Sequence, residues 1–405
     1  MEYLNWYDFD TNDVFDEYTG LNVEILEDPE LLEWFMYSRK IMRLQYDAIE
    51  AYNLLMGEFI CTENGWLEFV YSDDYAGAFI DDNHNLIVQL TNMDCSTMEV
   101  YNILVEYSDV VQFVEVAHSL NELNDFGHFF VEVLEESDLQ ITSFGIDVKN
   151  NSFSISLYYA DPESAAFVDS FSIMARALPV PISINLGVHM ESRALEGGSG
   201  IGISQMGSGF SVGATGRSPM GNALVTTGHF EHISHNRAVF RGTTQIGTVM
   251  SFRAGNTGGG NPGTVNGDWS IISLNATGST MMTNRLRTGE FLGPVSDPRI
   301  SPPGTFVAGT GMMTLSWGGR IYRTNQHFPT QSHGTITGVT IVDYTGSNNS
   351  SVRGDSGGTI VSGSTTGGGL VFQGVLVGGR QHPVTRQPQW IFTPYHWFAH
   401  LFAPR

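Results

Sequence analysis

The spacing of apolar residues over the first 190 positions alternates between the helix and strand periods. Apolar side chains recur every three or four residues over 29–56, after Asp28 as an N-cap residue. Residues 75–91 hold two β-rich runs around the turn DDNHN, which predicts a hairpin. The same patterns predict helices at 97–107, 121–136 and 161–177, strands at 110–117 and 181–188, and a second hairpin at 141–159 that turns at Asn150 and Asn151. This half therefore reads as α/β, a small sheet with helices on one face.

The second half has a different pattern. Short β-branched runs recur between Gly, Pro, Asn and Ser turns, at 222–228, 268–274, 304–309, 333–342, 358–363 and 371–379. This pattern is typical of an antiparallel sandwich or barrel. Residues 255–267 are rich in glycine and predict an exposed loop, and the spacing of aromatic residues over 394–404 predicts a C-terminal helix.

Charge and glycine content change at the same place as the pattern. Residues 1–192 carry a net charge of -31 and 7 of the 46 glycines, whereas residues 193–405 carry +7 and the other 39. We therefore expect two domains, an acidic one over 1–190 and a glycine-rich one over 191–405. Opposite charges of this size attract at long range, and salt screens the attraction.

Composition excludes several classes of protein. No apolar run approaches the ~18 residues of a membrane span. The acidic opening residues show no signal peptide. The arginines of the second half are scattered without a basic run, which argues against nucleic acid as a partner. Both cysteines, Cys61 and Cys95, lie in the acidic half, where they either pair or remain free thiols.

One serine, Ser356, stands in a cluster of glycines in the stretch SSVRGDSGGTIV, just before an apolar strand. A nucleophilic serine needs a base, a group that orients the base, and donors for the oxyanion. The backbone N–H groups of Gly354 and Ser356 can supply the donors. His229 follows the strand NALVTTG and is the candidate base, and Asp268 begins the strand DWSIISL and is the candidate orienting group. The chain order His, Asp, Ser is that of the chymotrypsin-type triad.

Residues 195–402 resemble the chymotrypsin-fold serine peptidases, in particular the α-lytic protease and streptogrisin branch. The resemblance lies in the stretches GSGFSV (207–212), VTTGH (225–229), GDWSIISL (267–274), HGTIT (333–337), RGDSGG (353–358) and QGVLVGG (373–379). It implies two antiparallel six-stranded β-barrels with the triad His229, Asp268 and Ser356 between them. It also implies an oxyanion hole at Gly354 and Ser356.

The same resemblance implies how a peptide substrate would bind. Gly378 and Gly379 would offer backbone groups to an extended peptide, and Ser351 and Leu376 would line the pocket for the residue before the scissile bond. The matching positions are apolar or small, so an apolar residue is expected there. No cofactor is implied.

The chain departs from the branch at three places. Val377 stands where the family usually has a serine that bonds the triad aspartate, so Asp268 is expected to have one donor fewer. Trp317 stands where a basic residue normally pairs with Asp355, and Arg320 is the nearest substitute. The disulfides of the family are absent.

The acidic half fits the N-terminal pro-region of streptogrisin-type enzymes, which acts as a folding chaperone and inhibitor. The resemblance therefore implies a secreted zymogen whose pro-region binds its own catalytic domain. The processing site is expected within 186–198, after Leu186 or Met190.

Two other functions remain open, and two possible metal sites are weighed. The chain could be a catalytically silent homologue whose acidic half is a permanent binding partner, or a cytosolic regulatory protease. His229, His232 and His235 have a metal-like spacing, but the turn at Gly228 does not place them on one face. The DDNHN turn lacks the glycine and distal glutamate of a calcium loop. We therefore expect no metal.

Overall fold

The chain is described by a computed structural model. It describes residues 29–63, 66–135, 141–157, 180–186, 211–229, 234–241, 243–253, 264–280, 282, 286, 292, 301–311, 317–330, 334–344, 355–364, 370–382, 385 and 387–404. We call the described residues up to 186 the N-terminal half and those from 211 the C-terminal half.

The predicted helix over 29–56 is confirmed, but it is broken in two. Helix α3 (Pro29–Leu44) and helix α4 (Tyr46–Glu58) meet at Gln45, which is fully buried. The Gln45 amide donates to the carbonyl of Gly304 over 2.9 Å and accepts from the N–H of Phe306 over 2.6 Å. The break therefore lies where the helix pair binds the C-terminal half.

The N-terminal half contains a two-stranded sheet, β1–β2, and two three-stranded sets instead of the single sheet that we expected. Both predicted hairpins form, and in each the third strand joins in parallel. The strands are β1 (Ile60–Glu63), β2 (Trp66–Phe69), β3 (Tyr75–Ile80), β4 (Leu86–Leu90), β5 (Val111–Glu115), β6 (Ile141–Asp147), β7 (Ser152–Leu157) and β8 (Ile182–Leu186). The remaining helices are α5 (Cys95–Val100), the 3₁₀ helices η3 (Tyr101–Tyr107) and η4 (Val148–Asn150), and α6 (Leu120–Glu135). The predicted helix 161–177 lies outside the described residues.

A six-stranded antiparallel sheet opens the C-terminal half. Its order is β11-β12-β14-β10-β9-β21, so the last strand of the chain returns to its edge. The strands are β9 (Ala214–Ser218), β10 (Gly221–Thr226), β11 (Ala238–Arg241), β12 (Thr244–Arg253), β14 (Trp269–Leu274) and β21 (Ala403–Pro404), and helix α8 (Ala276–Thr280) follows β14.

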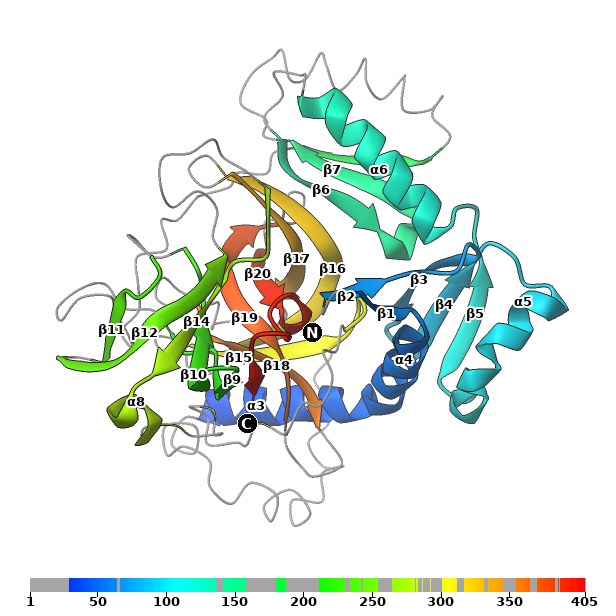
Figure 1. The fold of residues 1–405 in the computed structure, drawn as a ribbon. Helices are drawn as coiled ribbons and strands as arrows, with labels where there is room; N and C mark the ends of the chain where they lie inside the picture. The colour runs from blue at the N-terminus through cyan, green and yellow to red at the C-terminus, as the bar shows by residue number, and fades with distance from the viewer. Residues whose placement is uncertain are drawn as a thin grey trace, which may run out of the picture.

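Six of the other seven strands of this half close into a barrel. Their order is β17-β20-β19-β18-β15-β16, and β16 pairs again with β17. The strands are β15 (Phe306–Thr310), β16 (Trp317–Thr330), β17 (Gly334–Tyr344), β18 (Thr359–Ser364), β19 (Leu370–Gln381) and β20 (Pro388–Pro394), and β13 (Thr264–Asn266) pairs with β17 from outside. Figure 1 shows this barrel at the centre of the molecule, beside the six-stranded sheet.

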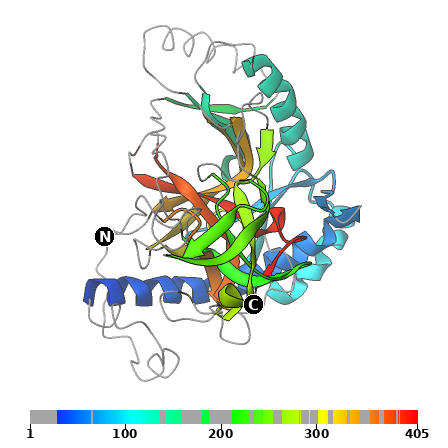
Figure 2. The same cartoon turned by 60° about the vertical axis from the view of Figure 1, so that its left-hand side comes forward.

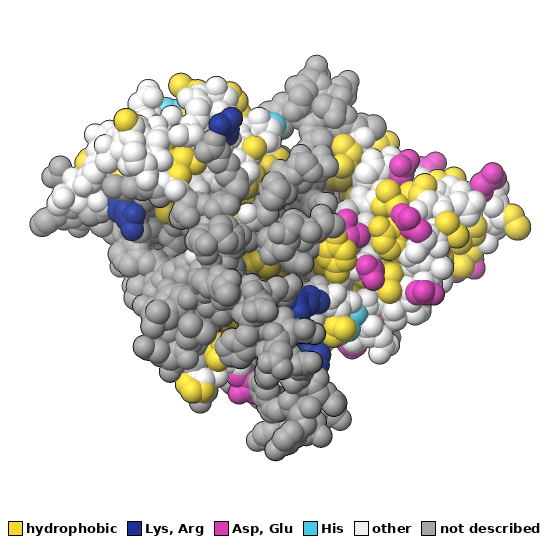
Figure 3. Space-filling model, turned by 90° about the horizontal axis from the view of Figure 1, so that it is seen from below, with side chains coloured by type: hydrophobic (Ala, Val, Ile, Leu, Met, Phe, Trp, Pro, Cys, Tyr) yellow, Lys and Arg dark blue, Asp and Glu magenta, His cyan; other side chains and the backbone are white. Residues whose placement is uncertain are grey.

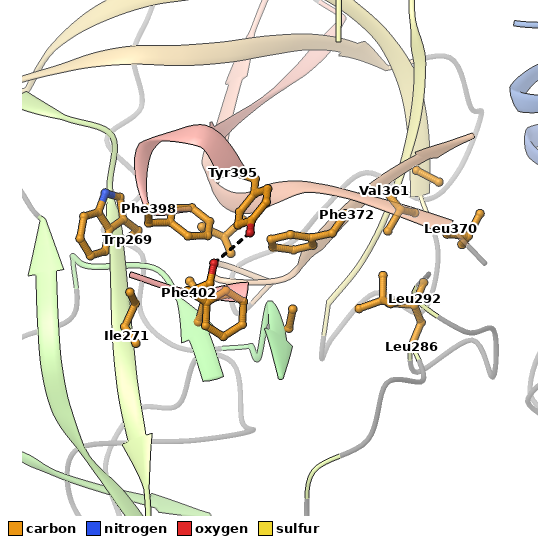
Figure 4. Packing of buried hydrophobic residues seen from close by; sticks show 14 of the residues in the cluster. Trp269, Ile271, Leu286, Leu292, Val361, Leu370, Phe372, Tyr395, Phe398 and Phe402 are labelled. Carbon is orange, nitrogen blue, oxygen red and sulfur yellow. Dashed lines mark hydrogen bonds between the residues drawn. The ribbon is translucent and has the colours of Figure 1, made fainter. Parts of the chain in front are cut away.

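The C-terminal helix is shorter than the aromatic spacing predicts. It is a single 3₁₀ turn, η5 (Tyr395–Trp397), followed by a further turn and β21. The Tyr395 hydroxyl donates to the carbonyl of Phe402 over 2.9 Å, which folds the segment back on itself. Its aromatic rings then fill the space between the sheet and the barrel, where Phe398 meets Trp269 and Phe372 (Figure 4).

The N-terminal half wraps the barrel at several places. Helix α3 lies beneath β15 and β18, and α4, β3 and β4 continue to one side (Figures 1 and 2). The Ile80 N–H donates to the carbonyl of Pro303 over 2.6 Å, and a side chain at Gly304 would collide with the Ile80 backbone. Strand β6 extends the barrel sheet by pairing with β16, where His327 stands opposite Phe144. The halves therefore share hydrogen bonds as well as apolar surface.

The surface keeps the charge contrast of the sequence. In Figure 3 most of the acidic side chains gather over the part of the molecule that holds α4, α5 and β5.

Cys95, at the start of α5, is an exposed free thiol and so does not pair with Cys61. Among the described helices, none has both the length and the apolar character needed to cross a membrane.

A half-buried histidine, His396, joins the two halves and makes stability depend on pH. The His396 ring lies between Trp397 and the edge of Phe69 in β2, and burial lowers its pKa from 6.5 to about 3. As pH falls below 6.5, the unfolded chain therefore takes up this proton before the folded chain does, and stability is lost down to about pH 3. We predict that His396→Phe has a smaller loss of urea midpoint between pH 7 and pH 4.5 than the wild type. His235→Phe, at an exposed position, is the control, and an unchanged loss in His396→Phe would contradict this assignment.

Candidate active site

His229 lies three residues beyond the end of β10. Its turn requires glycine at position 228, because a side chain there would collide with the backbone of Arg253 and with the Asp268 carboxylate. The Gly228 N–H instead donates to Asp268 Oδ1 over 2.7 Å. The strand end and this close approach together bring the imidazole to the carboxylate.

Asp268 is fully buried and immediately precedes β14. Its Oδ2 atom accepts from His229 Nδ1–H and also from the hydroxyl of Thr227, over 3.2 Å. The Thr227 hydroxyl also contacts His229 Nδ1. The buried carboxylate thus has three donors, which compensate its loss of water.

Two further hydroxyl groups hold this pair in place. Ser270, on β14, donates to the carbonyl of Thr227 over 2.7 Å. Thr393, on β20 of the barrel, accepts from the Asp268 N–H over 2.7 Å and donates to the Asp268 carbonyl over 3.0 Å. The barrel therefore fixes the Asp268 backbone, although Asp268 immediately precedes a strand of the six-stranded sheet.

Ser356 approaches from the barrel side, ahead of β18. Gly357 follows it with φ +82°, a conformation that favours glycine. The Ser356 carbonyl accepts from the N–H of Ser211 over 2.8 Å, and the Ser211 carbonyl accepts from the hydroxyl of Thr226 over 2.7 Å. Since Thr226 ends the strand that leads to His229, the serine loop lies directly against the histidine loop.

The serine hydroxyl and the imidazole are not hydrogen-bonded in this structure. Ser356 is 3% exposed, and its Oγ donates to the carbonyl of Val377 over 3.4 Å. His229 Nε2 is buried and has no hydrogen-bond partner among the described residues. Catalytic hydrogen bonds often tighten only when substrate is bound.

The other predicted site residues have different outcomes. Gly354 and Ser351 lie outside the described residues. Gly378 is half-buried and Gly379 is exposed on β19, where backbone groups can meet a ligand. Leu376 does not line a pocket: its side chain is 1% exposed in the barrel core, and its backbone holds Gly357 and Gly358.

The departures from the branch can also be located. Val377 is buried and offers no hydroxyl to Asp268; the second side-chain donor is Thr227 instead. Trp317 is buried and packs on Trp390 in the barrel core. Arg320 donates to the carbonyl of Gly304 over 3.2 Å. The Asp355 carboxylate lies against Gly311, where any side chain would collide with it.

The metal alternative gains no support from the part of the chain that the structure describes. Within it, no group of three His, Cys, Asp or Glu side chains could hold a metal ion. His232, one of the three histidines with metal-like spacing, lies outside that part.

One family of known proteins matches part of the N-terminal half. A family described as Pro-like N-terminal domain matches residues 38–113. In the C-terminal half, one sheet carries His229 and Asp268, and the barrel carries Ser356. The chain thus carries a stretch that matches a Pro-like N-terminal domain, followed by an antiparallel sheet and a barrel. No curated protein matches its sequence.

Three of the solved structures that are similar to part of the chain are described as proteases. A Nocardiopsis protease is 22% identical with a TM-score of 0.37, and protease A of Thermobifida fusca is 22% identical with a TM-score of 0.36. A serine protease described as specific for glutamic acid is 20% identical with a TM-score of 0.38. Each match covers 52% of this chain and 99% of the other.

Our sequence reasoning missed Thr227, Ser270 and Thr393, which hold the pair of His229 and Asp268. Hydroxyl groups at a strand end are common, so composition gives no signal for them. The two threonines before His229 could have been noticed, because the resemblance has alanine at the second of these positions.

The link between Thr393 and Asp268 can be tested by stability. Thr393→Val removes a buried hydroxyl that makes two hydrogen bonds to the Asp268 backbone, so unfolding free energy should fall by ~1–3 kcal/mol. Urea denaturation measures the change. Thr244→Val, at an exposed strand position, should change it by less than about 0.5 kcal/mol. Equal effects of the two variants would contradict the link.

Proposed function

We propose that the chain is a serine endopeptidase zymogen in which His229, Asp268 and Ser356 hydrolyse peptide bonds through an acyl-enzyme. The observation that carries this is a buried carboxylate bonded to His229 Nδ1, next to a buried serine in a glycine-rich loop from the other sheet. Because Nδ1–H donates to Asp268, the lone pair of the neutral imidazole is on Nε2, the atom without a partner among the described residues.

The proposed reaction follows from these positions. Ser356 Oγ attacks the carbonyl carbon of the peptide while His229 Nε2 takes its proton, and the backbone N–H groups of Gly354 and Ser356 stabilise the oxyanion. His229 then gives the proton to the departing amine. Water attacks the acyl-enzyme by the same route and frees the acid. Asp268 stabilises the imidazolium and holds its orientation.

The substrate is proposed to bind in extended form along β19. The exposed backbone at Gly379 and the half-buried Gly378 support this, since an extended peptide can pair with such an edge. We propose that the substrate carries an apolar residue immediately before the scissile bond. Ser351 is a candidate for lining the pocket that binds this residue. Leu376 is dropped because it packs in the core.

The N-terminal half is proposed to be the pro-region, over 1–190, with the peptidase domain over 191–405. The matched pro-like family and the hydrogen bonds between the two halves support this. Processing after Leu186 or Met190, and secretion, belong to the same proposal.

A second candidate is a silent homologue in which the N-terminal half is a permanent partner. The bond of Ser356 Oγ to the Val377 carbonyl, in place of His229, favours it.

Intact mass after expression separates the two candidates. We predict that the wild type is cut into two parts of roughly similar mass with a new N-terminus at 187–195, and that Ser356→Ala stays whole. Ser362→Ala, a buried serine on the adjoining strand, is the control and should be cut like the wild type. Cleavage of Ser356→Ala at the wild-type rate would contradict the nucleophile assignment.

Thr227 is proposed as a positioning residue that supplies the donor Val377 lacks. Its hydroxyl bonds Asp268 Oδ2 and contacts His229 Nδ1, so its loss should misplace the imidazole and leave substrate binding alone. We predict that Thr227→Val lowers kcat about 10-fold or more with KM unchanged, within the range known for orienting groups, and that Thr227→Ser retains most of kcat. Equal loss in both variants would contradict a role for the hydroxyl.

A further inference from the structure

A cluster of buried charges lies where the N-terminal half covers the barrel. Arg323 on β16 is 5% exposed and Arg380 on β19 is 6% exposed. The pKa of Arg380 is lowered to about 9, first by its burial and second by the charge of the nearby Arg323. Two guanidinium groups buried together require anions or acceptors nearby.

The N-terminal half supplies most of these acceptors. Arg323 Nη2 pairs with the Asp147 carboxylate over 2.6 Å, and its Nη1 donates to the hydroxyl of Ser154 over 2.5 Å. Arg380 Nη1 donates to the hydroxyl of Ser143 over 2.8 Å. All three acceptors lie on the hairpin β6–β7.

The C-terminal half supplies less. Arg380 Nε donates to the Gln389 amide over 2.7 Å, and Gln389 in turn donates to the Asp343 carboxylate over 2.5 Å. Without the hairpin, the two guanidinium groups would face one carboxylate among the described residues of their own half, Asp343. Arg323 Nε is buried and has no partner among the described residues. Removal of the N-terminal half therefore leaves an uncompensated positive charge.

This charge lies beside the proposed substrate strand. Arg380 directly follows Gly379, and it is three residues beyond Val377, whose carbonyl bonds the Ser356 hydroxyl. Three strand residues span ~10 Å. An extended peptide on β19 with its reacting carbonyl at Ser356 thus brings its third or fourth residue before the scissile bond to the two arginines.

We propose that Arg323 and Arg380 form a subsite for an acidic side chain of the peptide substrate, at the third or fourth residue before the scissile bond. In the uncleaved chain Asp147 occupies this subsite with its carboxylate. The proposal rests on the proposed function and deepens it. The preferred substrate would carry an apolar residue immediately before the scissile bond and an acidic residue at the third or fourth position before it.

The anion site can be tested without catalysis. In the full-length Ser356→Ala chain, Asp147→Ala leaves a space beside Arg323 that acetate can fill. We expect 100 mM acetate to raise the melting temperature of this variant by ~2 °C above equal chloride, since a ligand of the folded state stabilises it. The rise should be absent when Arg323→Gln is added, and absent with Asp147 intact. Equal effects of acetate and chloride would overturn the site.

The use of the site is tested with peptides. Four peptides share leucine before the scissile bond and carry glutamate or glutamine at the third or the fourth position before that bond. We expect the processed chain to cut one glutamate peptide with kcat/KM about 10-fold above its glutamine counterpart, as for a close charge pair. Arg380→Gln should lose this ratio, whereas Arg217→Gln, at an exposed arginine of β9, should keep it.

The outcomes separate the two proposals. Hydrolysis without any preference for glutamate overturns the subsite and leaves the proposed function standing. If no peptide is cut, the proposed function fails, and the subsite proposal for a substrate fails with it, whereas the acetate result still decides whether the arginines bind carboxylates.

Discussion

The burial of the Asp268 carboxylate is the constraint on which the site depends. A charge removed from water needs donors, and here they come from the Gly228 backbone, the Thr227 hydroxyl and the His229 ring. Each of these fixes part of the histidine turn. The turn must contain glycine because the carboxylate and the Arg253 backbone leave no room for a side chain. The local sequence thus follows from one buried charge.

Asp268 also couples the two β-structures, through its backbone. Thr393 of the barrel holds the Asp268 backbone, and Ser211 connects the serine loop to Thr226. A site split between two sheets would otherwise depend on how rigidly the sheets pack. The aromatic rings of the C-terminal segment fill the space between them, so packing and hydrogen bonds maintain the same alignment.

The two halves are joined by different interactions at each place of contact. Gln45 and Gly304 form an uncharged, closely fitted contact on one side of the barrel, whereas Asp147 and Arg323 form a buried ion pair on another. Breaking one member of a buried pair leaves an uncompensated charge, which is strongly unfavourable. The second contact is therefore stable only while an anion is present, whether it comes from the N-terminal half or from another molecule.

Much of this could be predicted from the sequence. Local patterns predict the hairpins and the strands of the barrel. A specific motif then locates His229, Asp268 and Ser356 next to strands. What could not be predicted depends on partners far along the chain. The helix break at Gln45 is set by Gly304 and Phe306, and the role of Thr227 is set by the absence of a hydroxyl at Val377. The aromatic spacing at the C-terminus reflects packing on two sheets, so the helix there is a single 3₁₀ turn and shorter than we expected.

The most direct test of the central claim is covalent labelling with a small fluorophosphonate, which reacts with an activated serine. Intact mass and peptide mapping would follow the labelled chain. We predict one adduct, on Ser356, with a rate that falls by about 100-fold or more in His229→Ala, as expected when a nucleophile loses its base. An adduct on another serine, or equal rates with and without His229, would contradict the account.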